Sequence, residues 1–120
     1  MQITQNQNAI RIWKNLELNI IYAGHAIVGQ DWKEPKVCSP FSRIYYIVDG
    51  EGILTVNGQR IVLKKGSVWL VPAGMTFGYF CESSMEQLFF HLNVLCSDGT
   101  DLLYGVRQLY ERKERTGEIA

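Results

Sequence analysis

The sequence predicts an all-β domain, folded as a sandwich or barrel and followed by one C-terminal helix. Three observations lead to this prediction. Between residues 10 and 95 the chain is a series of short runs rich in β-branched and aromatic residues, which is the composition of strands. Turns containing Gly separate these runs, and short strands at regular spacing favour a sandwich or barrel. After residue 98 the apolar residues take up helical spacing.

The strand candidates follow one another closely along the chain. The strongest is RIYYIV at residues 43–48, which runs into the turn-like DGEG at residues 49–52. Asn57-Gly58 separates two β runs and predicts a type I′ hairpin, because that turn needs positive φ at both central residues. In chain order the expected strands cover residues 10–13, 18–22, 43–48, 53–56, 60–63, 68–71, 76–81 and 87–95.

Residues 99–120 are expected to form an amphipathic helix. Leu102, Val106 and Leu109 have the spacing i, i+4 and i+7, which places them on one helical face. Two uses of this face stay open: contact with a second copy in a homodimer, and packing on the chain's own barrel. Residues 9–98 are expected to form that barrel, and residues 1–8, rich in Gln and Asn, a flexible N-terminal arm.

Length and charge limit the classes of function. A chain of 120 residues fits one domain. It has 12 Lys and Arg residues and 12 Asp and Glu residues, so the neutral chain has no general attraction for nucleic acid or anionic lipid. No apolar stretch approaches the ~20 residues that cross a bilayer. Three separate cysteines without a CxxC pair indicate reduced thiols. We therefore expect a cytoplasmic protein without a membrane partner.

Two segments resemble the conserved motifs of the cupin superfamily. The first contains Gly-Glu-Gly at 50–52, and the second is GSVWLVPAGMTF at 66–77. In cupins the first motif carries His-x-His and a Glu, the second ends in His, and these residues bind a metal. The corresponding positions here are residues 36–39, Arg43 and Phe77. A divalent metal needs several neutral or anionic donors, so we expect neither a metal nor another cofactor.

A longer stretch resembles the N-terminal domain of AraC-type transcription regulators. It comprises residues 41–80 and EQLFFHLNV at 86–94. The resemblance implies a cupin-like double-stranded β-barrel (jelly roll) that binds a small effector, with a helical segment after it that makes a dimer contact. It also implies a separate helix-turn-helix domain that binds DNA, which these 120 residues do not include. We favour a fragment of such a regulator, and a stand-alone relative is the alternative.

The resemblance and the strand alternation together indicate which side chains face the interior. Arg43 has the forked donor geometry that suits a carboxylate, a phosphate or a sugar hydroxyl; the alternative is an ion pair with Glu34 or Glu51. Aromatic rings stack on sugar CH groups, and their alternative role is core packing. For the two histidines, the alternative to effector binding is a purely structural role. The expected effector-binding residues are Arg43, Tyr45, Phe77, Tyr79, Phe89, His91, His25 and Trp32.

The sequence thus predicts an effector-sensing and dimerisation domain that is not an enzyme. Its expected ligand is a small polar metabolite, with a sugar as one candidate, and any DNA contact would need the helix-turn-helix domain. No catalytic residue is predicted, because no Ser-His-Asp order or Gly-rich phosphate loop is present. Two alternatives remain open. One is a stand-alone cupin enzyme of the isomerase or epimerase type, using Tyr and His as acid and base. The other is a dimerisation module whose interior is filled by its own side chains.

Overall fold

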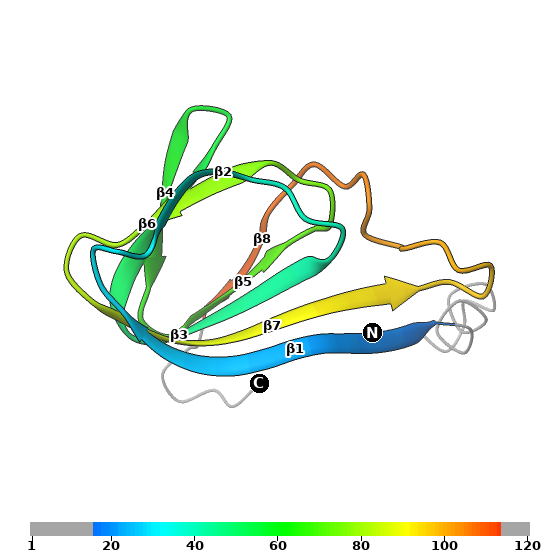
Figure 1. Cartoon of the computed structure of the whole chain (residues 1–120), viewed down its shortest axis with the longest axis horizontal. Coiled ribbons are helices and arrows are strands. Elements are labelled where there is room, and N and C mark those ends of the chain that lie inside the picture. The colour runs from blue at the N-terminus through cyan, green and yellow to red at the C-terminus, as the bar shows by residue number, and fades with distance from the viewer. Residues whose placement is uncertain (1–15, 114–120) are drawn as a thin grey trace.

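The computed structural model describes residues 16–113, and this part of the chain is all-β (Figure 1). No helix occurs within it, and none is therefore long and apolar enough to cross a membrane. The all-β prediction is confirmed for these residues, while the expected arm at 1–8 and strand at 10–13 lie outside them. The strands are β1 (Glu17–Val28), β2 (Lys33–Val37), β3 (Ser42–Val56), β4 (Gln59–Lys64), β5 (Ser67–Val71), β6 (Phe77–Phe80), β7 (Met85–Leu95) and β8 (Tyr110–Lys113).

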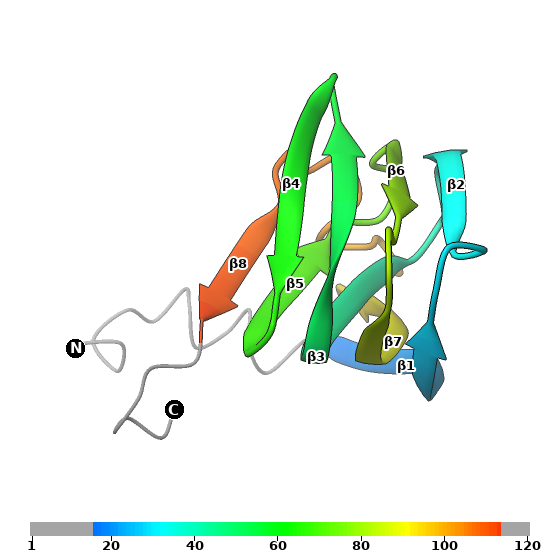
Figure 2. The same ribbon diagram turned by 90° about the vertical axis from the view of Figure 1, so that its left-hand side faces the viewer.

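The strands pair antiparallel throughout and form two halves that share β3 (Figures 1 and 2). Sheet A has the order β1-β7-β3-β5-β8. Sheet B contains the second half of β3 with β4 and β6, and β2 pairs with β6. β1 and β8 end the order of sheet A without pairing with each other in the described chain. The structure is therefore an open sheet folded over on itself, where the sequence suggested a double-stranded β-barrel.

The turn expected at residues 49–52 is a bend within β3. This strand runs through 15 residues without a break. Gly50 has φ 73°, and the register of β3 against β7 shifts between Ile47 and Asp49. Before the bend β3 pairs with β5 and β7, and after it with β4 and β6. A glycine is suited to this position because an L side chain rarely adopts positive φ.

The hairpin prediction at Asn57-Gly58 is confirmed. Asn57 has φ 51° and Gly58 has φ 79°, as a type I′ turn requires. Val56 and Gln59 are paired across the turn, and β3 and β4 run antiparallel from there.

The helix expected over 99–120 does not occur in residues 99–113, and 114–120 lie outside the described residues. Asp101 accepts a hydrogen bond from the backbone N–H of Leu103 (2.9 Å), an Asp-turn contact that competes with helical bonding. Gly105 has φ 89°, which no α-helix allows. The chain then adds β8 to the free edge of β5. The three expected dimer residues therefore form no helical stripe: Leu102 is exposed, Val106 is half-buried, and Leu109 packs against the core.

The core lies between sheet A and sheet B. Ile47 of sheet A and Leu54 and Leu63 of sheet B are fully buried. Ser42, also fully buried, accepts a hydrogen bond from the backbone N–H of Ala73 (2.9 Å). That bond ties the start of β3 to the loop before β6, which is where the candidate site is found.

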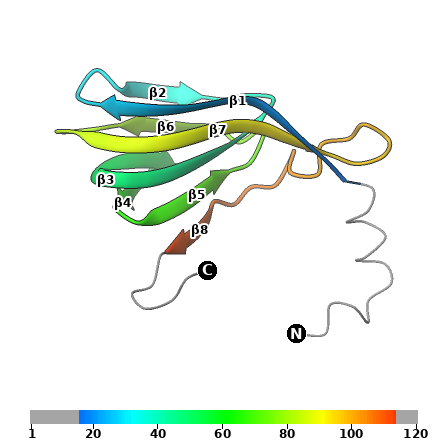
Figure 3. The same cartoon turned by 90° about the horizontal axis from the view of Figure 1, so that it is seen from below.

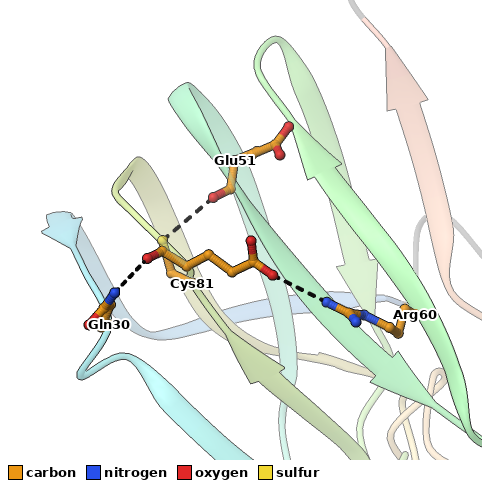
Figure 4. Close-up of polar contacts among 5 residues, drawn as sticks. Gln30, Glu51, Arg60 and Cys81 are labelled. Atoms are coloured by element: carbon orange, nitrogen blue, oxygen red, sulfur yellow. Dashed lines mark hydrogen bonds and ion pairs between the residues drawn. The ribbon is translucent and has the colours of Figure 1, made fainter.

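The turn between β6 and β7 is held by polar contacts from three directions (Figure 4). The Gln30 side chain donates to the carbonyl oxygen of Glu82 (3.0 Å), and Arg60 of β4 donates to the Glu82 carboxylate (3.4 Å). The Cys81 thiol donates to the carbonyl oxygen of Glu51 in β3 (3.5 Å). These contacts fix the turn against both β3 and β4.

A substitution in β6 tests the packing of sheet B. A methyl group at Gly78 would lie 2.6 Å from the carbonyl oxygen of Pro35 in β2. We expect Gly78→Ala to lower the free energy of unfolding by about 1–3 kcal/mol, as overpacking does, in urea denaturation. The control is Gly29→Ala, whose added methyl finds no atom closer than 3.5 Å. Equal losses in the two variants would contradict the close approach of β2 and β6.

Candidate functional site

The structure brings together seven of the eight residues expected to bind an effector. Neighbouring members are in ring contact, in cation–π contact or paired across strands. They come from β3, β6, β7 and the loop before β2. We call this group the Arg43 cluster; its members are Trp32, Tyr45, Tyr79, Phe77, Arg43, His91 and Phe89.

Arg43 lies at the centre of the cluster between two aromatic rings. Its guanidinium carbon is 5.1 Å from the centroid of Phe41 and 5.5 Å from that of Phe77, within the range of cation–π attraction. One terminal nitrogen, Nη2, donates to the hydroxyl of Ser39 (2.9 Å). The ion pairs of residues 16–113 do not include Arg43, so the alternative of an ion pair with Glu34 or Glu51 is wrong.

Two buried polar atoms on the core face of sheet A have no hydrogen-bond partner within residues 16–113. One is Nε of Arg43 and the other is Oε1 of Gln87, whose residue is only 3% exposed. Buried polar groups are nearly always hydrogen-bonded in folded proteins. Both atoms are therefore candidates for contact with a bound polar molecule.

Tyr45 is the most deeply buried phenol of the cluster. Burial raises its pKa above the usual value, and the neighbouring Arg43, through its charge and through hydrogen bonding to the phenol, opposes this rise. The phenol is therefore protonated at neutral pH and available as a hydrogen-bond donor. It is paired across sheet A with Phe89 on one side and Trp69 on the other.

Four aromatic rings form one wall of the cluster. The Trp32 and Tyr79 ring centroids are 4.3 Å apart, and Trp32 meets Tyr45 edge-on at 6.2 Å. Phe77 lies two residues before Tyr79 in β6, with 6.2 Å between the ring centroids. Phe77 is buried, while Trp32 and Tyr79 are half-buried. The wall therefore extends from the core toward the surface.

His91 lies on the other side of Arg43. It stacks on Phe41, with ring centroids 4.5 Å apart, and contacts Tyr22 and Phe89 at 6.0 and 5.7 Å. Burial lowers its pKa, and the positive charge of Arg43 lowers it further. The imidazole is therefore neutral at pH 7 and has one nitrogen free to accept a hydrogen bond.

Phe89 occupies space that a missing side chain leaves open. A methyl group at Gly24 in β1 would lie 2.5 Å from the end of the Phe89 ring. Gly24 and Phe89 are paired across β1 and β7. The ring therefore lies over the backbone of β1, and a larger residue at Gly24 would require the ring to shift.

His25 is the one expected residue that lies elsewhere. Its imidazole Nε2 is 2.7 Å from a carboxylate oxygen of Glu86, and both side chains are substantially exposed. His25 neighbours Gly24, so its side chain points to the opposite face of β1. The structure thus separates His25 from the Arg43 cluster.

Sequence reasoning missed three residues that contact the cluster: Ser39, Phe41 and Tyr22. Ser39 and Phe41 precede Arg43 by four and two residues, and that alternation was a usable signal. Tyr22 contacts Phe89 and His91 only because the register between β1 and β7 shifts between Ile20 and Tyr22. The sequence around residues 20–22 contains no local pattern that predicts this register shift.

The family follows from a comparison with known domains. The profile of the cupin domain matches residues 28–92, which is more than half of the chain. The chain is a cupin. The match begins at the end of β1 and reaches β7, so it includes every member of the Arg43 cluster.

Solved structures similar to this cupin agree on the fold. EutQ of Clostridium difficile is 11% identical, with a TM-score of 0.52, over 69% of each chain. A "predicted oxalate decarboxylase" of Thermotoga maritima is 18% identical, with a TM-score of 0.53, over 64% of this cupin and 79% of that chain. Salicylate 1,2-dioxygenase of Pseudoaminobacter salicylatoxidans is 21% identical, with a TM-score of 0.50, over 72% of this cupin and 24% of that chain.

These similarities establish the fold and leave the activity open. Structures of such low identity share an architecture, and one architecture hosts many functions. Two of the three are named as enzymes and EutQ is not. No curated protein matches this cupin in sequence. The family match supports the cupin part of the sequence prediction and does not extend to the AraC-type resemblance.

The metal site common among cupins is not supported by the residues of this chain. Ser39, Arg43 and Phe77 stand at or near the ligand positions of the motifs, and the structure brings these three into contact. A hydroxyl, a guanidinium and a phenyl ring do not form a donor set for a divalent ion. Within residues 16–113, no three His, Cys, Asp or Glu side chains are grouped to hold a metal.

The electrostatic link between Arg43 and His91 can be measured by NMR. The Arg43 charge disfavours the protonated imidazole, so its removal in Arg43→Gln should raise the pKa of His91. A titration of the His91 ring resonances checks this, with the resonances of His25, far from Arg43, as the internal reference. An unchanged or lower His91 pKa in the variant would show that the two side chains do not interact.

Proposed function

We propose that this cupin is an effector-binding module of a transcription regulator and that its effector is a small organic acid. The regulator part is supported by the sequence resemblance of residues 41–80 and 86–94 to AraC-type proteins. The ligand class is supported by the Arg43 cluster. Within this proposal the effector occupies the cluster, and its carboxylate meets Arg43.

The observation that carries the ligand class is that Arg43 forms no ion pair with any acidic residue between residues 16 and 113. Its Nε is buried and has no partner within the described residues, and Ser39 is a neutral acceptor for one terminal nitrogen. Charged groups that leave water are normally paired. A carboxylate is the natural complement, because a guanidinium binds it through two parallel hydrogen bonds. A neutral sugar would add no counter-charge to the attraction that the rings of Phe41 and Phe77 already give.

The aromatic residues favour a ligand with a flat or apolar body. Trp32 and Tyr79 are half-buried and adjacent to the buried Phe77. Small-molecule sites combine such apolar surfaces with a few polar groups that fix orientation. The protonated phenol of Tyr45 and the neutral imidazole of His91 supply one donor and one acceptor for substituents of the acid.

Two other functions have observations in their favour. Tyr45 and Phe77 are each only 3% exposed, which supports a dimerisation module whose interior is filled by its own rings. A protonated phenol and a neutral imidazole on either side of Arg43 also form an acid and base pair of the kind that an isomerase would use. Ligand binding separates the first from our proposal, and ligand turnover separates the second.

The proposal predicts that organic acids stabilise the protein through Arg43. In a thermal-shift screen, aromatic and aliphatic carboxylates should raise the melting temperature, since a ligand that binds only the folded state stabilises it. For the best acid, Arg43→Gln should weaken binding in calorimetry by at least about tenfold, equivalent to about 1.4 kcal/mol. The bound acid should be recovered chemically unchanged.

Arg60→Gln is the matched control, since Arg60 also lies over an aromatic ring, Phe80 at 5.1 Å, but on the exposed side of β4. Its affinity for the acid should equal that of the wild type. Binding of neutral sugars in preference to acids, or equal loss in the two variants, would refute the ligand class. Conversion of the acid would favour the enzyme, and stoichiometric zinc, iron or manganese in the purified protein would contradict the metal-free site.

A further inference from the structure

Sheet A has a second face that the Arg43 cluster does not use. Tyr45, Trp69 and Gln87 are buried on the core face, and successive residues of a strand point to opposite faces. The residues between them therefore lie on the other side, which we call the outer face. The strand registers align these residues in two rows across the five strands. Row one is Ala23, Phe90, Ile44, Leu70 and Tyr110, and row two is His25, Leu88, Tyr46, Val68 and Arg112.

The outer face is apolar where water-facing strands are usually polar. Eight of the ten residues in the two rows are apolar or aromatic, and the two exceptions, His25 and Arg112, lie on the edge strands β1 and β8. An antiparallel sheet with one solvated face normally alternates apolar and polar residues. Here Leu88 is 36% and Tyr110 46% exposed. Figure 3 views the molecule from this side, with β1, β7, β3, β5 and β8 next to one another.

The size of the outer face fits a stable protein interface. Five strands spaced by about 4.8 Å make a sheet about 19 Å across. The 11 residues of β7 extend about 36 Å, whereas the five residues of β5 and the four of β8 extend only about 17 Å and 13 Å. The face therefore has an area on the order of 600 Å². Each partner of a standard interface contributes about 800 Å². Exposed apolar patches mark interaction sites; of the eight apolar residues in the two rows, Ala23, Leu88 and Tyr110 are exposed and the other five are half-buried.

We propose that the outer face of sheet A is a homodimer interface, covered by the same face of a second copy. Two sheets pack face to face at about 10 Å, with their side chains interdigitated. A two-fold axis makes one patch its own complement. The apolar centre and charged edges of the outer face are typical of such interfaces, whose centres are depleted of charge.

The charges at the edges favour one orientation of the two copies. The Glu86 carboxylate of β7 contacts the His25 imidazole of β1 at 2.7 Å, and Arg112 lies at the β8 edge. A two-fold axis parallel to the strands places the β8 edge of one copy over the β1 edge of the other. Arg112 then faces Glu86 of the partner subunit, twice per dimer. An axis across the strands would instead bring like edges together.

This interface differs from the helix-mediated dimer that the sequence suggested, and it does not depend on the proposed ligand. It uses β-strands within the folded domain, and Leu102, Val106 and Leu109 take no part in it. The Arg43 cluster lies on the opposite face of the same strands β3 and β7. Ligand and partner would therefore bind the two faces of one sheet.

Sedimentation equilibrium of the full chain tests the proposal. The wild type should be a dimer, and Leu88→Glu, which places a charge within row two, should raise the dimer dissociation constant by at least about tenfold. The matched control is Val62→Glu in β4 of sheet B, because Val62 is 40% exposed and lies away from the outer face. It should dimerise as the wild type does.

Far-UV circular dichroism shows whether the variants keep their β structure. Tyr110→Glu, at the exposed edge of row one, serves as the second variant if Leu88→Glu does not fold, and it should also weaken the dimer. A monomeric wild type would overturn the proposal and indicate that residues outside 16–113 or another protein cover the face. A dimer that both outer-face variants leave intact would place the interface elsewhere.

Discussion

The structure depends on a single strand that belongs to both of its halves. β3 enters sheet A at Ser42, bends at Gly50 and continues in sheet B as far as Val56. Because one backbone carries both sheets, the bend at Gly50 contributes directly to how the two sheets lie relative to each other. The core residues Ile47 and Leu54 stand on either side of that bend, and their burial closes the two sheets on each other.

The position of β3 in both sheets determines the geometry of the candidate site. Arg43 and Tyr45 come from the first half of β3, while Phe77 and Tyr79 come from β6, which pairs with the second half. The cupin motifs supply the backbone positions, and the side chains at those positions change the chemistry. A guanidinium between two aromatic rings attracts anions and repels metal ions. The same scaffold therefore presents a cation where metal-binding cupins present a metal.

Both faces of sheet A are apolar, and this links the two proposals. β3 and β7 carry the Arg43 cluster on one face and the centre of the outer face on the other. Since a ligand changes an association equilibrium only through its different affinity for the two states, binding at Arg43 would influence the dimer by shifting β3 or β7. Only a single layer of backbone separates the two faces of the sheet. Ligand binding on one face and dimer contact on the other are therefore close enough to influence each other.

The sequence by itself determined the local features. Strand composition, the Asn57-Gly58 hairpin and the cupin spacing of glycine and proline depend on neighbouring residues, and the structure confirms them. Alternation along β3 and β6 was enough to place Arg43, Tyr45, Phe77 and Tyr79 on one side, because the period of a strand is two.

Tertiary structure decided what depends on distant partners. The segment around Leu102 to Leu109 has helical spacing, yet a free edge on β5 and the turn at Gly105 favoured a strand. The sequence around Gly50 predicts a turn. In the structure it is a bend within one continuous strand, because β3 pairs with other strands on both sides of Gly50. Tyr22 reaches the cluster through a register shift, and the outer face exists only once five strands separated in sequence lie side by side. These outcomes were set by backbone hydrogen bonds and packing between segments that are far apart in the sequence. Local sequence patterns carry no information about such pairings.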